Sequence, residues 1–493
     1  MLISGTIVSF AQSVDVLSTH ADVGNVQHTG RTSYDKKNQR YILTGSGANI
    51  WGKEDQFHFA YRRLQGNFIL QAKVKLEGKG VDPHRKAGWM IRSSLATDAV
   101  MAAGAVHGDG LVSLQFRREP GKDVEELKSP VTGPDVIQLE RRDSLIVLSV
   151  AEFGEPFSAV QVSKVEMGDE VFAGLFICSH NNAVKETAIF ENVRVVIPPG
   201  ENFTAYRDYL GSYLEVMDIA TRARSVIHAE PRSLQAPNYR DRNTLIYNSE
   251  GLIYSIPAEG GKPAVLNTGD VKQNNNDHVV SFDGKLLGLS SSSGEKEYGS
   301  LVYVVPIEGG TPRRITPLGP SYLHGFSPDG KWVTYTGLRN KDYDIYKIPV
   351  DGGEEVRLTD AAGLDDGSEY SPDGRFIYFN SARTGKMQLW RMKPDGSSQE
   401  QLTDDEFNNW FPHISPDGKW IAFLSYQKEV RADDHPFYKQ VYLRLMPADL
   451  STKPVVIAYV YGGQGTINTP SWSPDSKRIA FISNTDIIPK TKK

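Results

Sequence analysis

Cysteine is almost absent from this chain, since Cys178 is the only one among 493 residues. Internal disulfides and cysteine-based metal sites are therefore excluded. Basic blocks are absent too, and at a formal net charge of −5 the chain is not expected to bind nucleic acid. No apolar run reaches the ~18–20 residues that a membrane-spanning helix needs, so no membrane span is expected.

Common catalytic signatures are also missing. The chain contains no GxSxG nucleophile elbow, no phosphate-binding loop and no HExxH helix motif. Hydrolases and nucleotide-dependent enzymes of those classes therefore have no support in the sequence.

The N-terminal stretch lacks charge. Residues 2–11 read LISGTIVSFA, with small Ser9 and Ala11 just before Gln12. Such a pattern is typical of the end of a secretory signal, here residues 1–12, and predicts a periplasmic or secreted protein. A first β-strand is the alternative interpretation of the same residues.

What the chain has in abundance is a repeated phrase, Ser-Pro-Asp-Gly. It reads FSPDG at 326–330, YSPDG at 370–374 and ISPDG at 414–418, with altered copies at 281–284 (SFDG) and 472–476 (WSPDS). The aspartates of the five copies are 46, 44, 44 and 58 residues apart: Asp283, Asp329, Asp373, Asp417 and Asp475. Periods of about 40–50 residues indicate a repeat architecture.

Each repeat predicts four short strands. Pro and Gly make SPDG and the later DGG into turns, and the runs between them alternate with period two. Four strands per repeat is typical of a propeller blade. Five blades are expected at 234–270, 276–317, 322–359, 365–403 and 409–460. A sixth would combine 471–484 with 211–229, so that strands from both ends of this region close the ring and remove its exposed edges.

The segments IYKIPVDGGEEVRLT and LWRMKPDGSSQEQLT, together with the SPDG phrases, resemble the TolB-type six-bladed propeller family. The resemblance covers roughly 205–484 and implies a propeller domain at 201–493. It implies little about function, because this fold hosts scaffolds, peptidase accessory domains and lyases.

Residues 13–198 lack SPDG and nearly lack helical periodicity. Alternating runs such as FILQAKVKLEG at 68–78 predict an antiparallel β-sandwich. The segment 51–74 resembles concanavalin-like jelly-roll modules that accompany carbohydrate-active domains. A carbohydrate-binding platform could then use Trp51, His58, Tyr61, Arg62 and Arg63, whereas the alternative makes Trp51, Phe57, Phe59 and Tyr61 core residues. The predicted fold class is therefore all-β, a sandwich followed by a six-bladed propeller.

Residues four to six positions before each SPDG aspartate should lie on the innermost strands, around a central channel. Three of the eleven histidines, His278, His324 and His413, fall there on separate blades. With Gln464 they are the predicted ligands of a divalent metal, Mn, Zn, Fe or Ca. His278 and His324 lie five residues before their aspartate but His413 lies four before, so a regular strand would point them to opposite sides. Polar side chains that merely line a water-filled channel are the alternative.

Oligogalacturonate lyases are also propellers that hold a metal through histidines and a glutamine, and this set is similar in kind. That resemblance implies β-elimination from a sugar acid, with Glu369 or His413 as the candidate base. Further substrate contacts are predicted for polar and aromatic residues at the same channel mouth or just after the second strands: Asp277, Arg339, Asp366, Arg383, Asn409, Trp410 and Asn468. The two arginines could instead be solvated or pair with nearby acids.

The insertion QKEVRADDHPFYKQ at 427–440 predicts a lid, a partner-binding loop or a plain solvated loop. Two functions stay open. The first is an exported carbohydrate-binding or carbohydrate-processing protein, with a metal-dependent lyase as the candidate enzyme. The second is a non-catalytic, TolB-like periplasmic scaffold that binds protein partners on a propeller face.

Overall fold

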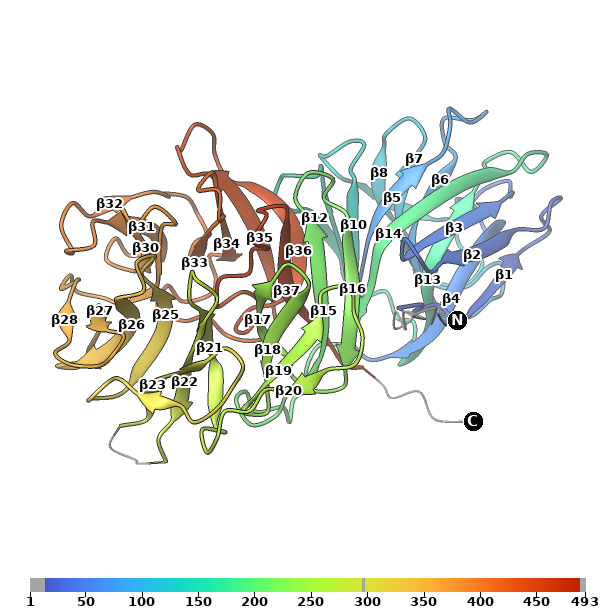
Figure 1. Cartoon of the computed structure of the whole chain (residues 1–493). Coiled ribbons are helices and arrows are strands. Elements are labelled where there is room, and N and C mark those ends of the chain that lie inside the picture. The colour runs from blue at the N-terminus through green and yellow to red at the C-terminus, as the bar shows by residue number, and fades with distance from the viewer. Residues whose placement is uncertain (1–13, 295–297, 488–493) are drawn as a thin grey trace, which may run out of the picture. The chain divides into compact units, whose positions relative to one another are not determined.

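The computed structural model describes residues 14–294 and 298–487 (Figure 1). The predicted signal segment 1–12 lies outside the described residues. The described chain divides at Pro198 into two compact units, and each unit has its own strands and core.

The first unit is built from two antiparallel sheets of seven strands each. One sheet contains, in spatial order, β1 (Thr19–Val23), β4 (Phe57–Gln65), β13 (Glu170–Cys178), β6 (Lys86–Arg92), β7 (Met101–His107), β8 (Val112–Arg117) and β9 (Glu125–Lys128). The other contains β12 (Ser158–Val162), β11 (Leu145–Ala151), β10 (Val136–Arg142), β5 (Phe68–Leu76), β14 (Glu186–Val196), β3 (Arg40–Gly45) and β2 (Arg31–Asp35). The predicted β-sandwich is confirmed.

Alternation along the strands explains why the two sheets pack. Phe68, Leu70 and Ala72 of β5 share one buried cluster with Trp89 and Ile91 of β6 on the opposite sheet. Period-two spacing puts such residues on one face of each strand, and burying that face is the main driving force for the sandwich.

The residues of the predicted sugar platform differ in exposure. Phe57 and Phe59 are fully buried in a second cluster, as the core alternative predicts. His58 is buried, and its Nδ1 lies 2.7 Å from Asp22 Oδ1, so it is not available as a surface contact. Trp51 is 43% exposed and the Arg63 side chain 64%, whereas Tyr61 is half-buried and stacks on Phe59 at 5.1 Å. A glycan-binding role for the sandwich stays a prediction.

The second unit is the propeller, and five of its sheets have four strands (Figure 1). Blade one comprises β17 (Gln235–Asp241), β18 (Thr244–Ser249), β19 (Leu252–Pro257) and β20 (Ala264–Val265). Blade two comprises β21 (Asn274–Val280), β22 (Leu286–Ser292), β23 (Ser300–Pro306) and β24 (Arg313–Arg314). Blade three comprises β25 (Ser321–Phe326), β26 (Trp332–Arg339), β27 (Asp342–Pro349) and β28 (Val356–Arg357). Blade four comprises β29 (Asp365–Tyr370), β30 (Ile377–Ser381), β31 (Gln388–Met392) and β32 (Glu400–Gln401). Blade five comprises β33 (Asn408–Ile414), β34 (Trp420–Tyr426), β35 (Lys439–Pro447) and β36 (Val455–Gly462).

The sixth blade closes the ring as predicted. Its sheet has the order β16 (Arg224–Glu230), β15 (Gly211–Asp218) and β37 (Arg478–Thr485), and Trp472 adds a single bridge to Ile479. Strands from the two ends of the domain thus pair side by side, which removes a sheet edge that would otherwise be open.

The SPDG phrase is a turn held by its own side chains. In blade four, the Ser371 hydroxyl donates to Asp373 Oδ1 at 2.6 Å and accepts the Phe376 N–H at 3.0 Å. Asp373 Oδ1 also accepts the Arg375 N–H, and Gly374 takes a positive φ of 70°. Serine, aspartate and glycine are therefore each needed for the local geometry, which explains the recurrence.

The innermost strands are irregular in a way that the sequence does not reveal. The strand register shifts between Asn274 and His278 in β21, and between Leu323 and Gly325 in β25. It shifts again within β29 and β33, before Glu369 and before His413. A bulge changes which side chains point inward, so these shifts decide the composition of the channel wall.

Candidate functional site

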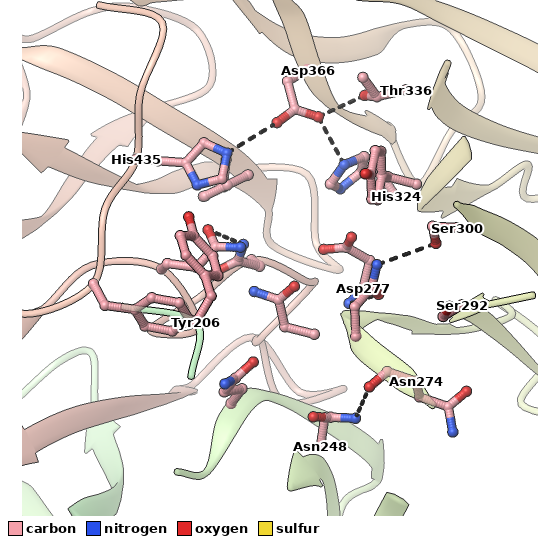
Figure 2. A pocket seen from close by; sticks show the side chains of 18 of the residues that line it. Tyr206, Asn248, Asn274, Asp277, Ser292, Ser300, His324, Thr336, Asp366 and His435 are labelled. Atoms are coloured by element: carbon pink, nitrogen blue, oxygen red, sulfur yellow. Dashed lines mark hydrogen bonds and ion pairs between the residues drawn. The ribbon is translucent and has the colours of Figure 1, made fainter. Parts of the chain in front are cut away.

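A cavity of about 1230 Å³ lies at the centre of the propeller. Its wall includes at least one side chain from each blade, among them Asn248, Asp277, His324, Asp366, Phe411 and Asn468. Figure 2 shows several of them converging on one space. Because the first strands of neighbouring blades contact one another, the ring brings together residues that are far apart in sequence.

Amides and aromatic rings are the commonest side chains in the wall. The amides include Asn248, Gln273, Asn275, Asn276, Gln464 and Asn468, and the rings include Tyr206, Tyr209, Tyr322, Tyr343, Phe411 and Phe437. Amide side chains both donate and accept hydrogen bonds, while the rings offer flat apolar faces. Such a wall suits a ligand with alternating polar groups and apolar surface.

Two acids and two histidines form the charged centre of the cavity. His324 Nε2 lies 2.9 Å from Asp366 Oδ1, which also accepts the Thr336 hydroxyl at 2.6 Å. His435 Nε2 is more distant, 3.9 Å from Asp366 Oδ2. In Figure 2, Asp277 lies below this group on the same cavity.

Burial and neighbouring charges push the two acids in opposite directions. Burial raises the pKa of Asp277 to about 7, with His324 opposing the rise and Asp366 adding to it. Burial would also raise the pKa of Asp366, but the charge and hydrogen bond of His324 outweigh it and hold the pKa at about 2. Burial lowers the pKa of His324, yet Asp366 and Asp277 raise it above its usual value. The pairing of His324 with Asp366 thus favours the charged form of both groups, whereas the pKa of Asp277 lies near neutral pH.

The predicted base candidates lie elsewhere. Glu369 and His413 do not line the cavity but bond to each other, with His413 Nδ1 2.7 Å from Glu369 Oε2. Glu369 Oε1 accepts the Ile414 N–H at 3.0 Å, and His413 Nε2 contacts the Ile467 carbonyl. Both side chains are buried, and together they tie blades four, five and six to one another. We call this pair the inter-blade clamp.

The predicted substrate-contacting residues separate into two groups. Asp277, Asp366 and Asn468 line the cavity. Arg339 instead pairs with Glu355 at 2.8 Å, and Arg383 pairs with Asp365 at 2.8 Å. Both arginines therefore pair with nearby acids, which is the alternative interpretation. The remaining two are buried away from the cavity: Asn409, which bonds to Gln388 and Ser425, and Trp410, which packs in a core cluster.

The four predicted metal ligands do not converge. His324 and Gln464 line the cavity, but His278 and His413 do not. His278 is completely buried, and burial lowers its pKa to about 4. Across residues 14–294 and 298–487, no group of three or more His, Cys, Asp or Glu side chains could hold a metal ion. The residues present therefore do not fit the predicted metal, and no chemical step is derived through one.

Several residues of the wall were missed by counting back from SPDG. The triple amide at 274–276 sits on the innermost strand of blade two, and such a run was a usable signal. Asp433, His435 and Phe437 come from the 427–440 insertion, which thereby contributes to the cavity wall as the lid or partner-loop alternative requires. No count from SPDG could place these three, because the insertion has no counterpart in the other repeats.

Comparisons with known proteins decide the family. The TolB β-propeller domain model matches residues 321–454. An uncharacterized protein of Agrobacterium fabrum, Atu1656, is 45% identical over 274 residues, which is 55% of this chain and 92% of that protein. The chain belongs to the TolB-like β-propeller family. A solved TolB-like protein from Agrobacterium tumefaciens is 43% identical, with a TM-score of 0.54, and covers 57% of this chain and all of its own.

The lyase resemblance is far weaker than the TolB-like one. A solved oligogalacturonate lyase from Vibrio parahaemolyticus is 12% identical, with a TM-score of 0.35, over 58% of this chain and 99% of its own. That likeness carries no argument about activity. The described part of the TolB-like chain also has no helix that is long and apolar enough to cross a membrane.

Proposed function

We propose that this chain is a non-catalytic binding protein whose propeller holds an extended segment of a partner protein in its central cavity. The observation that carries the proposal is the cavity wall, which draws amides or rings from five of the six blades and Asp366 from the remaining one. Its volume of about 1230 Å³ exceeds the ~300–1,000 Å³ of ordinary small-molecule pockets. An extended polypeptide offers a main-chain donor and acceptor at every residue, which the amides of the wall can match.

Catalysis has less support than binding. The two residues predicted as bases are engaged with each other and with main-chain groups in the inter-blade clamp. The likeness to TolB-like relatives favours the scaffold over the carbohydrate enzyme.

A neutral carbohydrate is the second candidate ligand, because amides and tyrosine rings also bind sugar hydroxyls and ring faces. A sugar acid fits less well. The wall carries five carboxyl groups and one guanidinium, Arg232, which itself lies 3.1 Å from Glu250. An anionic ligand would meet net repulsion there.

The test is a selection of random dodecapeptides on the purified full chain, run beside a glycan array. Ser292 is exposed on the cavity wall, so Ser292→Trp should obstruct the space without disturbing the core. Lys453→Trp, at an exposed position outside the wall, is the matched control. Peptides that lose about tenfold or more in affinity with Ser292→Trp but not with Lys453→Trp support the proposal.

Two results would overturn this proposal. Selected peptides could bind both variants as they bind the native chain, which would place their site outside the cavity. Alternatively, glycans alone could lose affinity in Ser292→Trp, which would show that the cavity binds carbohydrate.

Periplasmic export belongs to the same proposal and rests on the apolar, uncharged stretch 2–11. Fractionation of cells that express the full chain tests it. Recovery in the cytoplasmic fraction alone would contradict export.

A further inference from the structure

The cavity is acidic out of proportion to the rest of the chain. Glu250, Asp277, Asp342, Asp366 and Asp433 line it, against the permanent cation Arg232 and the histidine His324 that is paired with Asp366. The whole chain, in contrast, is close to balanced, with 60 acidic and 55 basic residues. A concave, partly desolvated wall of one sign concentrates its field inside the cavity and selects ligands of the opposite sign.

Asp277 is the unusual member of this set. It is only 6% exposed, yet among the described residues its carboxylate makes no hydrogen bond or ion pair, and only its backbone N–H is engaged, by Asn275 Oδ1. Burying an ionised carboxylate costs free energy unless the carboxylate is paired. An unpaired carboxylate on a cavity wall is therefore a candidate contact for a bound ligand.

The surroundings of Asp277 explain why no internal partner satisfies it. His324, whose charge acts on Asp277, donates to Asp366 instead, with Nε2 2.9 Å from Oδ1. Asp366 Oδ1 is fully used by His324 and Thr336, but Oδ2 has only the distant His435 at 3.9 Å. Figure 2 shows Asp277 and Asp366 facing the same interior space, with His324 and His435 on either side. Both oxygens of Asp277 and Oδ2 of Asp366 are therefore open to the cavity.

Aromatic rings complete the environment that a cation prefers. Tyr322 and Tyr343 line the wall beside these acids, and Phe411 stacks on His324 at 6.2 Å. Ring faces attract cations, and the attraction strengthens where water is excluded.

We propose that Asp277 and Asp366 form a subsite for a positively charged nitrogen, supplied by an arginine or lysine side chain of the bound polypeptide. This inference rests on the proposed function and adds ligand specificity to it. A guanidinium or ammonium would donate to the open oxygens of both acids, giving charge-assisted hydrogen bonds to the one group that lacks them in the free protein. Arginine is the better fit, because its planar fork can serve two carboxylates and stack on the rings.

Ionisation of Asp277 accompanies binding in this scheme. Burial raises the pKa of the free acid to about 7, so a cation that pairs with it stabilises the ionised form and releases a proton. The raised pKa follows from the same missing partner and does not carry the inference by itself.

The experiment is calorimetric titration of the full chain with acetyl-triarginine amide and with its uncharged isostere, acetyl-tricitrulline amide. Asp277→Asn and Asp366→Asn remove one charge each with little change in shape. Asp351→Asn removes a charge at a side chain that is 91% exposed and outside the wall, and serves as the matched control. We expect the arginine peptide to bind, the citrulline peptide to bind about tenfold or more weakly, and each cavity variant to lose a similar factor.

Outcomes separate this inference from the proposed function. Equal binding of the two peptides, or unchanged binding by Asp277→Asn, overturns the cation subsite while a cavity that binds peptides could stand. If neither peptide binds, the subsite is also overturned. Spermidine is the third probe, and tighter binding of spermidine than of the arginine peptide would keep the subsite but assign it to a free amine. Since Asp366→Asn disturbs the pairing of His324, the binding measured for Asp277→Asn decides the matter if the Asp366 variant fails to fold.

Discussion

Two histidine–carboxylate pairs lie on neighbouring blades of this propeller, and they have opposite roles. His413 and Glu369 form the inter-blade clamp, in which the described neighbours satisfy both nitrogens and both oxygens. His324 and Asp366 line the cavity, with one oxygen still open and the unpaired Asp277 nearby. The residue types are the same, so type alone does not distinguish a structural pair from a binding site.

The two acids of these pairs lie on the same strand, β29, with a register shift between them. Asp366 lines the cavity, whereas Glu369 bonds to His413 and to the Ile414 N–H of the next blade. Free acceptors on one side and complete pairing on the other give the two pairs different expected responses to mutation.

Removing the carboxylate of the clamp should have the largest effect. Glu369→Ala leaves the Ile414 N–H and the His413 ring without their acceptor in a buried interface. We expect a loss of about 3 kcal/mol in the free energy of unfolding, measured by urea titration. Glu369→Gln keeps one acceptor oxygen and should lose less. A loss below about 1 kcal/mol for the alanine variant would show that the clamp does not hold the blades.

Removing the unpaired carboxylate of Asp277 should instead raise the free energy of unfolding. The folded pKa of Asp277, about 7, lies above the ordinary 3.8, so the folded state binds its proton more tightly than the unfolded state. The cost of ionisation therefore grows from about pH 4 to pH 7 and persists above it. At most it reaches about 4 kcal/mol, and water in the cavity screens part of it, so Asp277→Asn should gain about 2 kcal/mol at pH 8.

The same comparison at pH 4 is the control for Asp277→Asn. There the carboxyl is protonated in the folded state and about half ionised in the unfolded state, so the gain should shrink to about 0.5 kcal/mol. A variant that is less stable than the native chain at both pH values would show that the carboxyl already has a partner.

Binding of the arginine peptide should depend on pH through the same group. From pH 8 to pH 6 the ionised fraction of Asp277 falls about tenfold, so the affinity for acetyl-triarginine amide should fall by about the same factor. Over this range Asp366 stays ionised, and Tyr322 and Tyr343, whose pKa values are raised, stay neutral. His324 becomes more positive as the pH falls, which also weakens the binding of a cation. Calorimetry in buffers of different ionisation enthalpy measures the proton released. An identical pH profile for Asp277→Asn would assign the effect to His324 instead.

The propeller could be predicted because its signals are local. Ser371, Asp373 and Gly374 build their turn from neighbouring atoms, so the phrase marks a turn wherever it occurs. Five such marks, at spacings of 46, 44, 44 and 58 residues, identify five blades. The alternating runs at 234–270 add another blade, and the strands at 211–229 and 471–484 give the closure.

The site could be predicted only in part, for a physical reason. Counting back from SPDG gives the height of a residue along its strand but not the side that it faces. Asp277, His324 and Asp366 face the cavity, whereas His278, Glu369 and His413 at similar heights do not. Bulges depend on main-chain pairing with the next strand, which period-two patterns in one strand do not encode. The insertion at 427–440 contributes by long-range packing that no repeat phrase marks.

The smallest expected effect concerns a ring at the cavity wall, and it tests how far the binding side extends. Tyr206 is 63% exposed and packs edge-on against Phe437 at 5.3 Å. Tyr206→Ala should weaken acetyl-triarginine amide about threefold, in keeping with ~0.5–1 kcal/mol for an exposed cation–π contact, and should leave unfolding unchanged. Phe282→Ala, at an exposed ring outside the wall, is the matched control. Tyr206→Phe should bind as the native chain does, because the ring face rather than the hydroxyl attracts the cation. Equal losses of affinity in Tyr206→Phe and Tyr206→Ala would instead assign the contact to the hydroxyl. No loss of affinity in either variant would limit the binding site to Asp277 and Asp366.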